Sequence, residues 1–313
     1  MKLLVVGSMA YDDVETPAGI RNHQLGGSVT YFSVAASYFT DVAILGIVGN
    51  DFRPEHRDLL TSRGIDTSGI EVVDGQTFRW SGSYLKDLND AETVATDLNV
   101  FADFNPTVPE GHRSIPYLFL ANCDPETQQS VLNQMTDDLQ LVAGDTMNHW
   151  IVEKRQSLDH LMTQLDFSVI NEAEARMYTE KSNLVDVAEG LLDEGPDNVI
   201  IKRGEYGAVL YNDNQRFIVP AYPVQNIVDP TGAGDSFAGG FMGYIAATSR
   251  HDPESYRQAV IAGSVIASFT VEGFGLDRLS NLTSEEITDR FFEFEDLTTF
   301  DTAIRLPLRQ LTD

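Results

Sequence analysis

The sequence predicts an α/β protein of three layers (α/β/α), with helices on both faces of a central, mostly parallel sheet, and with a small antiparallel β lid. Three observations predict the body. Short, continuous apolar runs are typical of strands buried on both faces. They alternate with longer segments of helical periodicity, which is the pattern of βαβ units. The 313 residues, 42% of them hydrophobic, show no linker or internal repeat, so we expect one domain over residues 1–313.

The predicted elements follow the chain in order. The apolar runs expected to be strands are Leu3–Val6, Val42–Ile47, Leu118–Leu120, Phe167–Ile170 and Val199–Ile201. The segments expected to be helices are Val29–Tyr38, Pro125–Gln134, Val185–Leu192, Asp235–Ala247 and Glu254–Phe269. In open parallel sheets, ligands bind beyond the carboxyl ends of the strands. Polar segments at 7–13, 171–174 and 202–207 follow three of these strands, so we expect them to converge on one rim with 229–235.

Residues 67–106 depart from this pattern. Thr77–Tyr84 and Thr93–Leu98 are alternating, β-prone segments surrounded by turn residues. They predict an antiparallel hairpin attached to the body. Two ordinary edge strands of the main sheet are the alternative, but a hairpin inserted between βα units favours a flap. We therefore expect a lid built from residues 10–28 and 67–106.

Three aromatic residues, Phe78, Trp80 and Tyr84, lie at strand spacing in this segment. Because side chains alternate along a strand, the three would project from one face, with Arg79 on the other. Two interpretations stay open. The aromatic face stacks on a sugar ring or a nucleobase, or it packs the lid against the body or against the lid of a second copy, which would give a homodimer.

The composition restricts the partners and the compartment. The formal net charge is −27, so the backbone of a nucleic acid or an anionic membrane would be repelled. The acidity suits either high intracellular salt, where screening relieves self-repulsion, or an ordinary acidic protein. The single cysteine, Cys123, excludes an internal disulfide framework. The apolar start is too short for a signal peptide and no run could span a bilayer, so we expect a cytoplasmic protein.

Residues 229–241 form the most informative segment, Asp-Pro-Thr-Gly-Ala-Gly-Asp-Ser-Phe-Ala-Gly-Gly-Phe. Gly232, Ala233 and Gly234 precede Asp235 at a predicted helix start, where free N–H groups and the helix dipole make an anion site. A carboxylate beside such a site is suited to removing a proton from a hydroxyl while phosphate charge develops next to it. An ordinary tight turn is the alternative. The spacings of a P-loop and of a dinucleotide fingerprint are both absent here.

Taken whole, residues 229–241 resemble the main signature of the ribokinase-like (PfkB) carbohydrate kinase family. Further landmarks of that family occur in its order over nearly the whole chain. The resemblance implies the ribokinase-like fold, ATP-dependent transfer of a phosphoryl group to an alcohol, and Asp235 as the general base. The backbone of Gly232, Ala233 and Gly234 would stabilise the charge on the transferred group.

On the acceptor side, the resemblance assigns Asp12 to the hydroxyls of the substrate, and the adjacent Asp13 leaves this assignment open by one position. Gly26 and Gly27 match a Gly-Gly that serves as a lid hinge and lets the backbone approach the sugar, with a plain turn as the alternative. Many members of the family carry an Asn where Tyr31 stands. This departure argues against a plain ribokinase or fructokinase.

On the nucleotide side, the residues that the resemblance places at ATP are Asn171, Lys202, Gly204, Gly207 and Ser264. Glu174, in an Asn-x-x-Glu pattern, would organise Mg²⁺ largely through waters, since Mg²⁺ keeps several of them. Asp229 matches a position that helps to hold a monovalent cation, usually K⁺. The alternatives are a capped helix start for Asn171 and Glu174, a solvated charge for Lys202, and close helix packing for Ser264.

Together these residues predict an ATP- and Mg²⁺-dependent kinase that phosphorylates a hydroxymethyl group of a sugar or nucleoside. Residues 145–150 lack the Arg of a family Asp-x-Asn-x-Arg segment. With the acidic charge, this absence argues against a phosphosugar and favours a free sugar, then a nucleoside. The alternative function is a non-catalytic sugar or nucleotide sensor on a kinase fold.

Overall fold

The computed structural model describes residues 2–299, so Met1 and residues 300–313 of the predicted domain lie outside the described residues. Its main sheet contains these strands: β1 (Leu3–Val6), β4 (Val42–Gly49), β5 (Asp66–Val73), β8 (Tyr117–Leu120), β9 (Leu141–Gly144), β10 (Phe167–Asn171), β11 (Asn198–Lys202), β12 (Ala208–Asn212) and β13 (Gln215–Val219). Within the described residues, these nine strands run in the order β13-β12-β11-β10-β9-β8-β1-β4-β5.

The sheet is mostly parallel, as predicted. Every pair from β11 across to β5 is parallel, whereas β12 and β13 add an antiparallel hairpin at one edge. The parallel strands therefore direct their carboxyl ends to the same side. On the interior strand β1, Leu3 and Val5 join one apolar core while Leu4 and Val6 join another, because side chains alternate across a strand.

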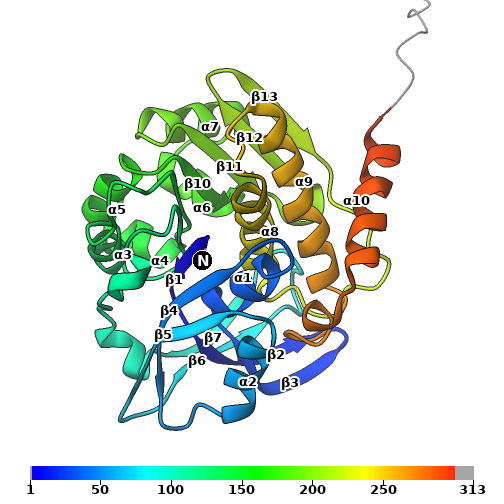
Figure 1. Cartoon of the computed structure of the whole chain (residues 1–313). Helices are drawn as coiled ribbons and strands as arrows, with labels where there is room; N and C mark the ends of the chain where they lie inside the picture. Colours follow the sequence, from blue (N-terminus) through cyan, green and yellow to red (C-terminus); the bar gives the residue numbers. More distant parts are fainter. Residues whose placement is uncertain (1, 300–313) are drawn as a thin grey trace, which may run out of the picture.

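Helices cover both faces of the sheet (Figure 1). One layer consists of α1 (Ser28–Ala36), α2 (Pro54–Ser62), α8 (Ala233–Thr248) and α9 (Pro253–Thr270), with α10 (Ser284–Thr298) packed outside α9. The other layer consists of α3 (Pro125–Leu132), α4 (Asn148–Glu153), α5 (Arg155–Met162), α6 (Glu172–Thr179) and α7 (Leu184–Asp193). The three-layer prediction is confirmed. Across residues 2–299, no helix has the length and apolar character needed to cross a membrane.

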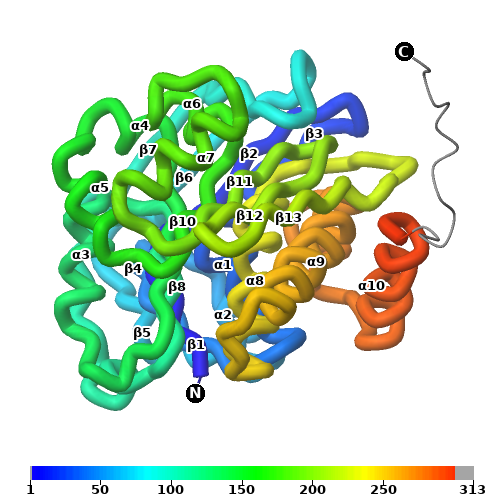
Figure 2. The backbone as a smooth tube through the Cα atoms, turned by 90° about the horizontal axis from the view of Figure 1, so that it is seen from above, coloured from blue at the N-terminus to red at the C-terminus, as the bar shows by residue number. Residues whose placement is uncertain are grey.

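Four further strands form a separate small sheet: β2 (Ala10–Thr16), β3 (Gly19–Gly26), β6 (Phe78–Ser83) and β7 (Glu92–Asp97), in the order β3-β2-β6-β7. Figure 2 shows them together on one side of the molecule. The hairpins β2–β3 and β6–β7 are antiparallel, and a parallel β2–β6 pair joins them. The predicted hairpin is thus not part of the main-sheet edge. Asp66–Val73, at the start of the predicted lid segment, is different, because it forms β5 of the main sheet.

Candidate active site

The segment around Asp235 makes a sharp turn into α8. Gly232 is the N-cap residue in the left-handed region (φ 74°, ψ 2°), which glycine adopts without strain. Within residues 2–299, the N–H groups of Gly234 and Asp235 donate to no other group, and no side chain caps the helix. The N–H of Ala233, in contrast, donates to the carbonyl of Pro230 at 3.1 Å. The start of α8 therefore offers two free donors and the positive end of a 16-residue helix.

Asp235 is half-buried among other charges. Desolvation, followed by the negative charge of Asp145, raises the pKa of Asp235 to about 7, and the ammonium of Lys202 opposes this rise. Lys202 Nζ donates to Asp145 Oδ2 at 2.9 Å, with side chains only 14% and 7% exposed. Lys202 is therefore an inward-facing charge at this site rather than a solvated one. A carboxyl with a pKa near 7 is suited to accepting a proton at neutral pH.

Asn171 and Glu174 form a capping box at the start of α6. Asn171 Oδ1 accepts the N–H of Glu174 at 2.8 Å, and Glu174 Oε2 accepts the N–H of Asn171 at 3.1 Å. The helix-start interpretation is therefore correct for the local structure. The same carboxyl also belongs to the charged group: desolvation, then Asp145, raises the pKa of Glu174 to about 8, while Lys202 opposes. A carboxylate oxygen beside other carboxylates is the type of ligand that Mg²⁺ takes, directly or through water.

On the acceptor side, Asp12 lies on β2 with only 4% of its surface exposed. Gly26 pairs with Ala10 on the neighbouring strand, and a Cβ at Gly26 would lie 1.8 Å from Asp12 Oδ2. Gly27 has φ 91°, and a Cβ there would meet the carbonyl of Ser8 at 2.5 Å. The two glycines thus let the backbone close around Asp12. Desolvation, then the charges of Asp229 and Asp235, raises the pKa of Asp12 to about 8.

The neighbouring Asp13 has a different role. Its Oδ1 accepts the N–H of His23, so it closes the β2–β3 hairpin. The charges that influence Asp12 instead include Asp229 and Asp235, which places its carboxyl in the site. Of the two candidates raised from the sequence, Asp12 is therefore the one that lies near Asp229 and Asp235.

The three aromatic residues of the lid, Phe78, Trp80 and Tyr84, differ in what they contact. Trp80 pairs in register with Asp12, which puts both side chains on the same face, and its ring covers Gly82. The hydroxyl of Tyr84 accepts a hydrogen bond from Thr231 at 3.4 Å, in the segment that leads into α8. Phe78 instead stacks on Phe101, with ring centroids 5.5 Å apart. Trp80 and Tyr84 thus face the site, whereas Phe78 packs the base of the lid.

Arg79 faces away from this site, as its parity predicts. Its guanidinium pairs with Asp51 Oδ2 at 3.5 Å. Asp51 also accepts hydrogen bonds from the backbone and hydroxyl of Thr77, both at 2.7 Å, where the chain enters β6. Arg79 therefore fixes the attachment of the lid to the body.

Tyr31 packs against the turn that begins α8. A Cβ at Gly232 would lie 2.3 Å from the Tyr31 ring, so the ring packs directly against the backbone of the glycine. The Tyr31 hydroxyl is buried and has no hydrogen-bond partner among the described residues. Burial, followed by the charge of Asp12, raises the pKa of Tyr31 well above its usual value. The neutral hydroxyl of Tyr31, which has no hydrogen-bond partner among the described residues, therefore lies near the carboxyl of Asp12.

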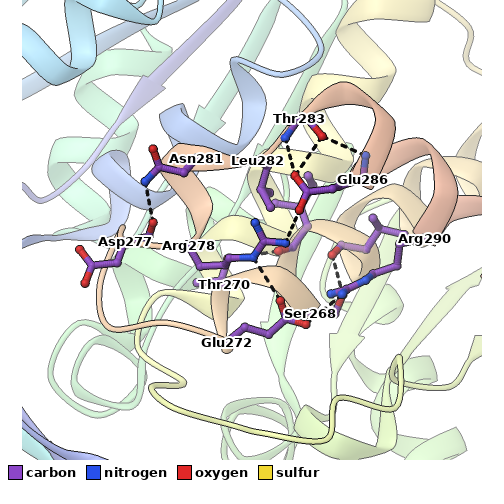
Figure 3. A network of polar contacts seen from close by, with 12 residues as sticks. Ser268, Thr270, Glu272, Asp277, Arg278, Asn281, Leu282, Thr283, Glu286 and Arg290 are labelled. Atoms are coloured by element: carbon purple, nitrogen blue, oxygen red, sulfur yellow. Dashed lines mark hydrogen bonds and ion pairs between the residues drawn. The ribbon is translucent and has the colours of Figure 1, made fainter.

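Asp229 is fully buried and accepts three N–H hydrogen bonds: from Thr231 at 2.9 Å, from Gly275 at 3.0 Å, and from Gln24 Nε2 at 3.2 Å. It thus ties residues 229–231 to the lid and to the loop after α9. Figure 3 shows the ion pairs that fix this loop. Arg278 pairs with Glu272 and Glu286, while Arg290, from α10, also pairs with Glu272.

The predicted nucleotide loop follows β11. Gly204 and Gly207 both have positive φ, 55° and 87°. A Cβ at Gly207 would lie 2.0 Å from the carbonyl of Val219, and one at Gly204 would lie 2.0 Å from Asn89 Oδ1 of the lid. Each glycine is thus required by a close contact within this chain. Ser264 lies on α9, where its hydroxyl donates to the carbonyl of Val260.

Two residues of this region were not candidates from the sequence: Asp145 and Asn89. Asp145 directly follows β9, so its position at the carboxyl end of a parallel strand is a signal that could have found it. Nothing in the sequence links Asn89 to residue 205, because the contact depends on how the lid folds across the body.

With this geometry described, comparison with known proteins identifies the family. A model of the pfkB family carbohydrate kinases matches residues 2–282. This chain belongs to that family. A cytidine kinase of Thermococcus kodakarensis is 29% identical to this pfkB kinase over 247 residues, which cover 77% of the chain and 87% of the relative.

Two solved structures share the pfkB fold. The nucleoside kinase of Methanocaldococcus jannaschii superposes with a TM-score of 0.74 at 21% identity, covering 94% of this chain and 99% of that one. A candidate ribokinase II of Escherichia coli, in complex with ATP and Mg²⁺, superposes with a TM-score of 0.74 at 20% identity, covering 93% and 99%. The predictions of the family, of its fold and of a kinase are confirmed.

Proposed function

We propose that this pfkB kinase transfers the γ-phosphoryl group of ATP to a hydroxymethyl group of a nucleoside or sugar, with Asp235 as the general base. One observation carries the proposal. The carboxyl of Asp235, with a pKa raised to about 7 by desolvation and by Asp145, lies directly at the free N–H groups that begin α8. A base and an anion site thus occupy adjacent residues of one turn.

The residues of this turn divide the chemistry between them. Asp235 accepts the proton of the acceptor hydroxyl as its oxygen attacks the γ-phosphorus. The N–H groups of Gly234 and Asp235 stabilise the charge on the equatorial oxygens, and the ammonium of Lys202 adds a positive charge nearby. Gly232 contributes the left-handed turn that aims these donors. The sequence predicted that the N–H groups of residues 232–235 would bind the transferred group. The N–H of Ala233 is not available for this role, because it already donates to the carbonyl of Pro230.

The nucleotide side uses the residues at the ends of β10 and β11. ATP supplies the phosphoryl group and Mg²⁺ neutralises its charge, as the Escherichia coli complex with ATP and Mg²⁺ suggests by its shared fold. Glu174 would hold Mg²⁺ through water beside Asn171. Gly204 and Gly207 would shape the loop against the nucleotide, and Ser264 would lie near its base. Residues 145–150 lack the Arg of the family segment. Lys202, whose ammonium pairs with Asp145 at the start of this segment, would supply a positive charge in its place.

A nucleoside is the acceptor class favoured by the relatives, which reverses the order preferred from the sequence. The cytidine kinase and the archaeal nucleoside kinase both support it. Trp80, beside Asp12, offers a face on which a base can stack. Asp12 would accept hydrogen bonds from ribose hydroxyls, and the unpartnered hydroxyl of Tyr31 would donate to one. A free sugar would use the same two groups without the stacking.

Two further parts of the proposal concern K⁺ and assembly. Asp229 would help to hold K⁺, although its oxygens already accept three N–H bonds, so activation by K⁺ needs a direct test.

A homodimer would form through β7, the edge strand of the lid sheet, whose residues are all exposed and include Val94 at 69%. An unpaired, exposed edge is suited to pairing with a second copy. Mass measurement in solution, with Val94→Lys as the disrupting variant, tests it.

The alternative of a non-catalytic sensor is not supported. The matched relatives are kinases, and a carboxylate beside free N–H donors at the start of α8 supports a working kinase. The proposal is tested by measuring ADP release across nucleosides, sugars and inositols, with and without K⁺, using Asp235→Asn as the blank. Acceptor-dependent ADP with a phosphorylated product by mass spectrometry supports it. Ligand-induced stabilisation without turnover on any acceptor would restore the sensor.

A further inference from the structure

The lid reaches across the site to the nucleotide loop. Its loop of residues 84–91 joins β6 to β7 and meets residues 204–205 after β11. Asn89 Oδ1 accepts the N–H of Glu205 at 2.9 Å, and Asn89 Nδ2 donates to Glu205 Oε1 at 3.2 Å. Two hydrogen bonds from one amide therefore fix the relative position of segments that are 116 residues apart in the sequence.

Local features on both sides suit this contact. On the body, Gly204 has φ 55°, and a Cβ there would lie 2.0 Å from Asn89 Oδ1. Any larger residue at 204 would displace the amide. On the lid, Asp87 Oδ1 accepts the backbone N–H of Asn89 at 2.8 Å and its side-chain amide at 3.3 Å, a turn that sets the direction of the amide. The glycine, the turn and the two hydrogen bonds all fit one docked position of the lid.

The contact connects the two substrate sides. The lid sheet carries Asp12 and Trp80, which face the acceptor, and residues 203–207 form the nucleotide loop. An acceptor held against the lid strands favours the docked lid. The docked lid in turn orders the nucleotide loop through Asn89. Each ligand would then lower the cost of ordering the segments that the other one needs.

We propose that Asn89 is a positioning residue which clasps the lid to the nucleotide loop, so that acceptor and nucleotide bind with positive cooperativity. The identity of the two ligands rests on the proposed function. The clasp itself rests only on the contacts between the lid and residues 204–205. Gly204 is thereby assigned a second role, since it admits the Asn89 amide whether or not it also approaches the nucleotide.

Hydrogen exchange tests the clasp without any activity. In the ligand-free protein, the amide of Glu205 should exchange at least about tenfold faster in Asn89→Ala than in the wild type, because its acceptor is lost. Asp90→Ala, a change in the same loop at a side chain without a hydrogen bond in the described residues, should leave that rate unchanged. Equal exchange of Glu205 in the wild type and Asn89→Ala would overturn the clasp.

Binding measurements test the cooperativity. Saturating cytidine should tighten ADP binding to the wild type by about fivefold or more, and to Asn89→Ala by at most about twofold. Gly204→Ala alone should reduce the cooperativity between cytidine and ADP. Adding Gly204→Ala to Asn89→Ala should reduce it no further. Retained cooperativity in Asn89→Ala overturns the proposal. If neither cytidine nor ribose binds, the proposed function and the cooperativity both fail, whereas the exchange of Glu205 still decides whether the clasp exists.

Discussion

The charge next to Asp235 should set the acidic limit of activity. With Asp235 as the proposed base, the rate should fall as the pH drops below its pKa, because only the ionised carboxylate accepts a proton. Desolvation and Asp145 raise this pKa to about 7, whereas Lys202 lowers it. Lys202→Met removes the ammonium and leaves Asp145 without its partner, and both changes raise the pKa of Asp235. Asp145→Asn removes a negative charge and should lower that pKa. The two variants are therefore predicted to act in opposite directions.

The magnitude follows from the size of charge–charge effects. An opposite charge within about 4–6 Å typically shifts a carboxyl pKa by about 1–3 units. Taking about one unit, because Lys202 is shared with Asp145, the pKa in Lys202→Met becomes about 8. The ionised fraction at pH 7 then falls from about one half to about one tenth, a loss of about fivefold beyond any pH-independent effect.

The assay is the initial rate of ADP release from pH 5.5 to 9.5, with both substrates well below saturation, so that the profile reports ionisation of the free enzyme. The ionisation of the nucleotide is common to the three proteins and cancels in the comparison. The acidic limb should move to higher pH in Lys202→Met and to lower pH in Asp145→Asn. Limbs that coincide, or that move in the same direction, would refute the role given to Lys202 and Asp145.

Three further predictions concern stability. Gly232→Ala should lower the free energy of unfolding by about 1–3 kcal/mol, because its φ of 74° and the nearby Tyr31 ring both oppose a Cβ; Tyr31→Ala should recover part of this loss in a thermal melt. Asp12 has a folded pKa of about 8, above its usual value, so its burial costs stability progressively as the pH rises from about 4 to 8. Asp12→Asn should therefore raise the melting temperature of the ligand-free protein at pH 8.5 more than at pH 5.5, and an equal change at both would contradict this assignment. If the net charge of −27 reflects adaptation to high salt, molar salt should raise the melting temperature strongly, whereas equal stability at low and molar salt would contradict that origin.

Much of the body could be predicted from the sequence because its strands are buried on both faces. Runs such as Leu3–Val6 and Val199–Ile201 correspond to β1 and to most of β11, since continuous burial leaves a continuous apolar pattern. Strand β9 was missed because Leu141–Gly144 ends in the small residues Ala143 and Gly144, so its apolar run is weaker than that of β1 or β8. The hairpin β12–β13 was not among the predicted strands, although β12 carries the continuous apolar run Ala208–Tyr211 and β13 alternates at the edge of the sheet.

The site was predictable where one short segment carries it. Residues 232–235 form a single turn, so their spacing already implies free donors beside a carboxylate. The pair Lys202–Asp145 could not be predicted, because it joins the ends of two strands whose neighbourhood depends on strand order. The parallel β2–β6 pair, which places Trp80 beside Asp12, was missed for the same reason. Long-range pairing leaves no mark on local periodicity.

The most direct test of the account is the turnover number of Asp235→Asn with its best acceptor, measured together with acceptor binding. Asn keeps the size and the hydrogen-bonding shape of the side chain but cannot accept the proton. The account predicts that kcat falls by about 10²–10⁴-fold, while the acceptor Kd and the melting temperature stay close to those of the wild type. Turnover near the wild-type value would contradict it, because another group would then remove the proton.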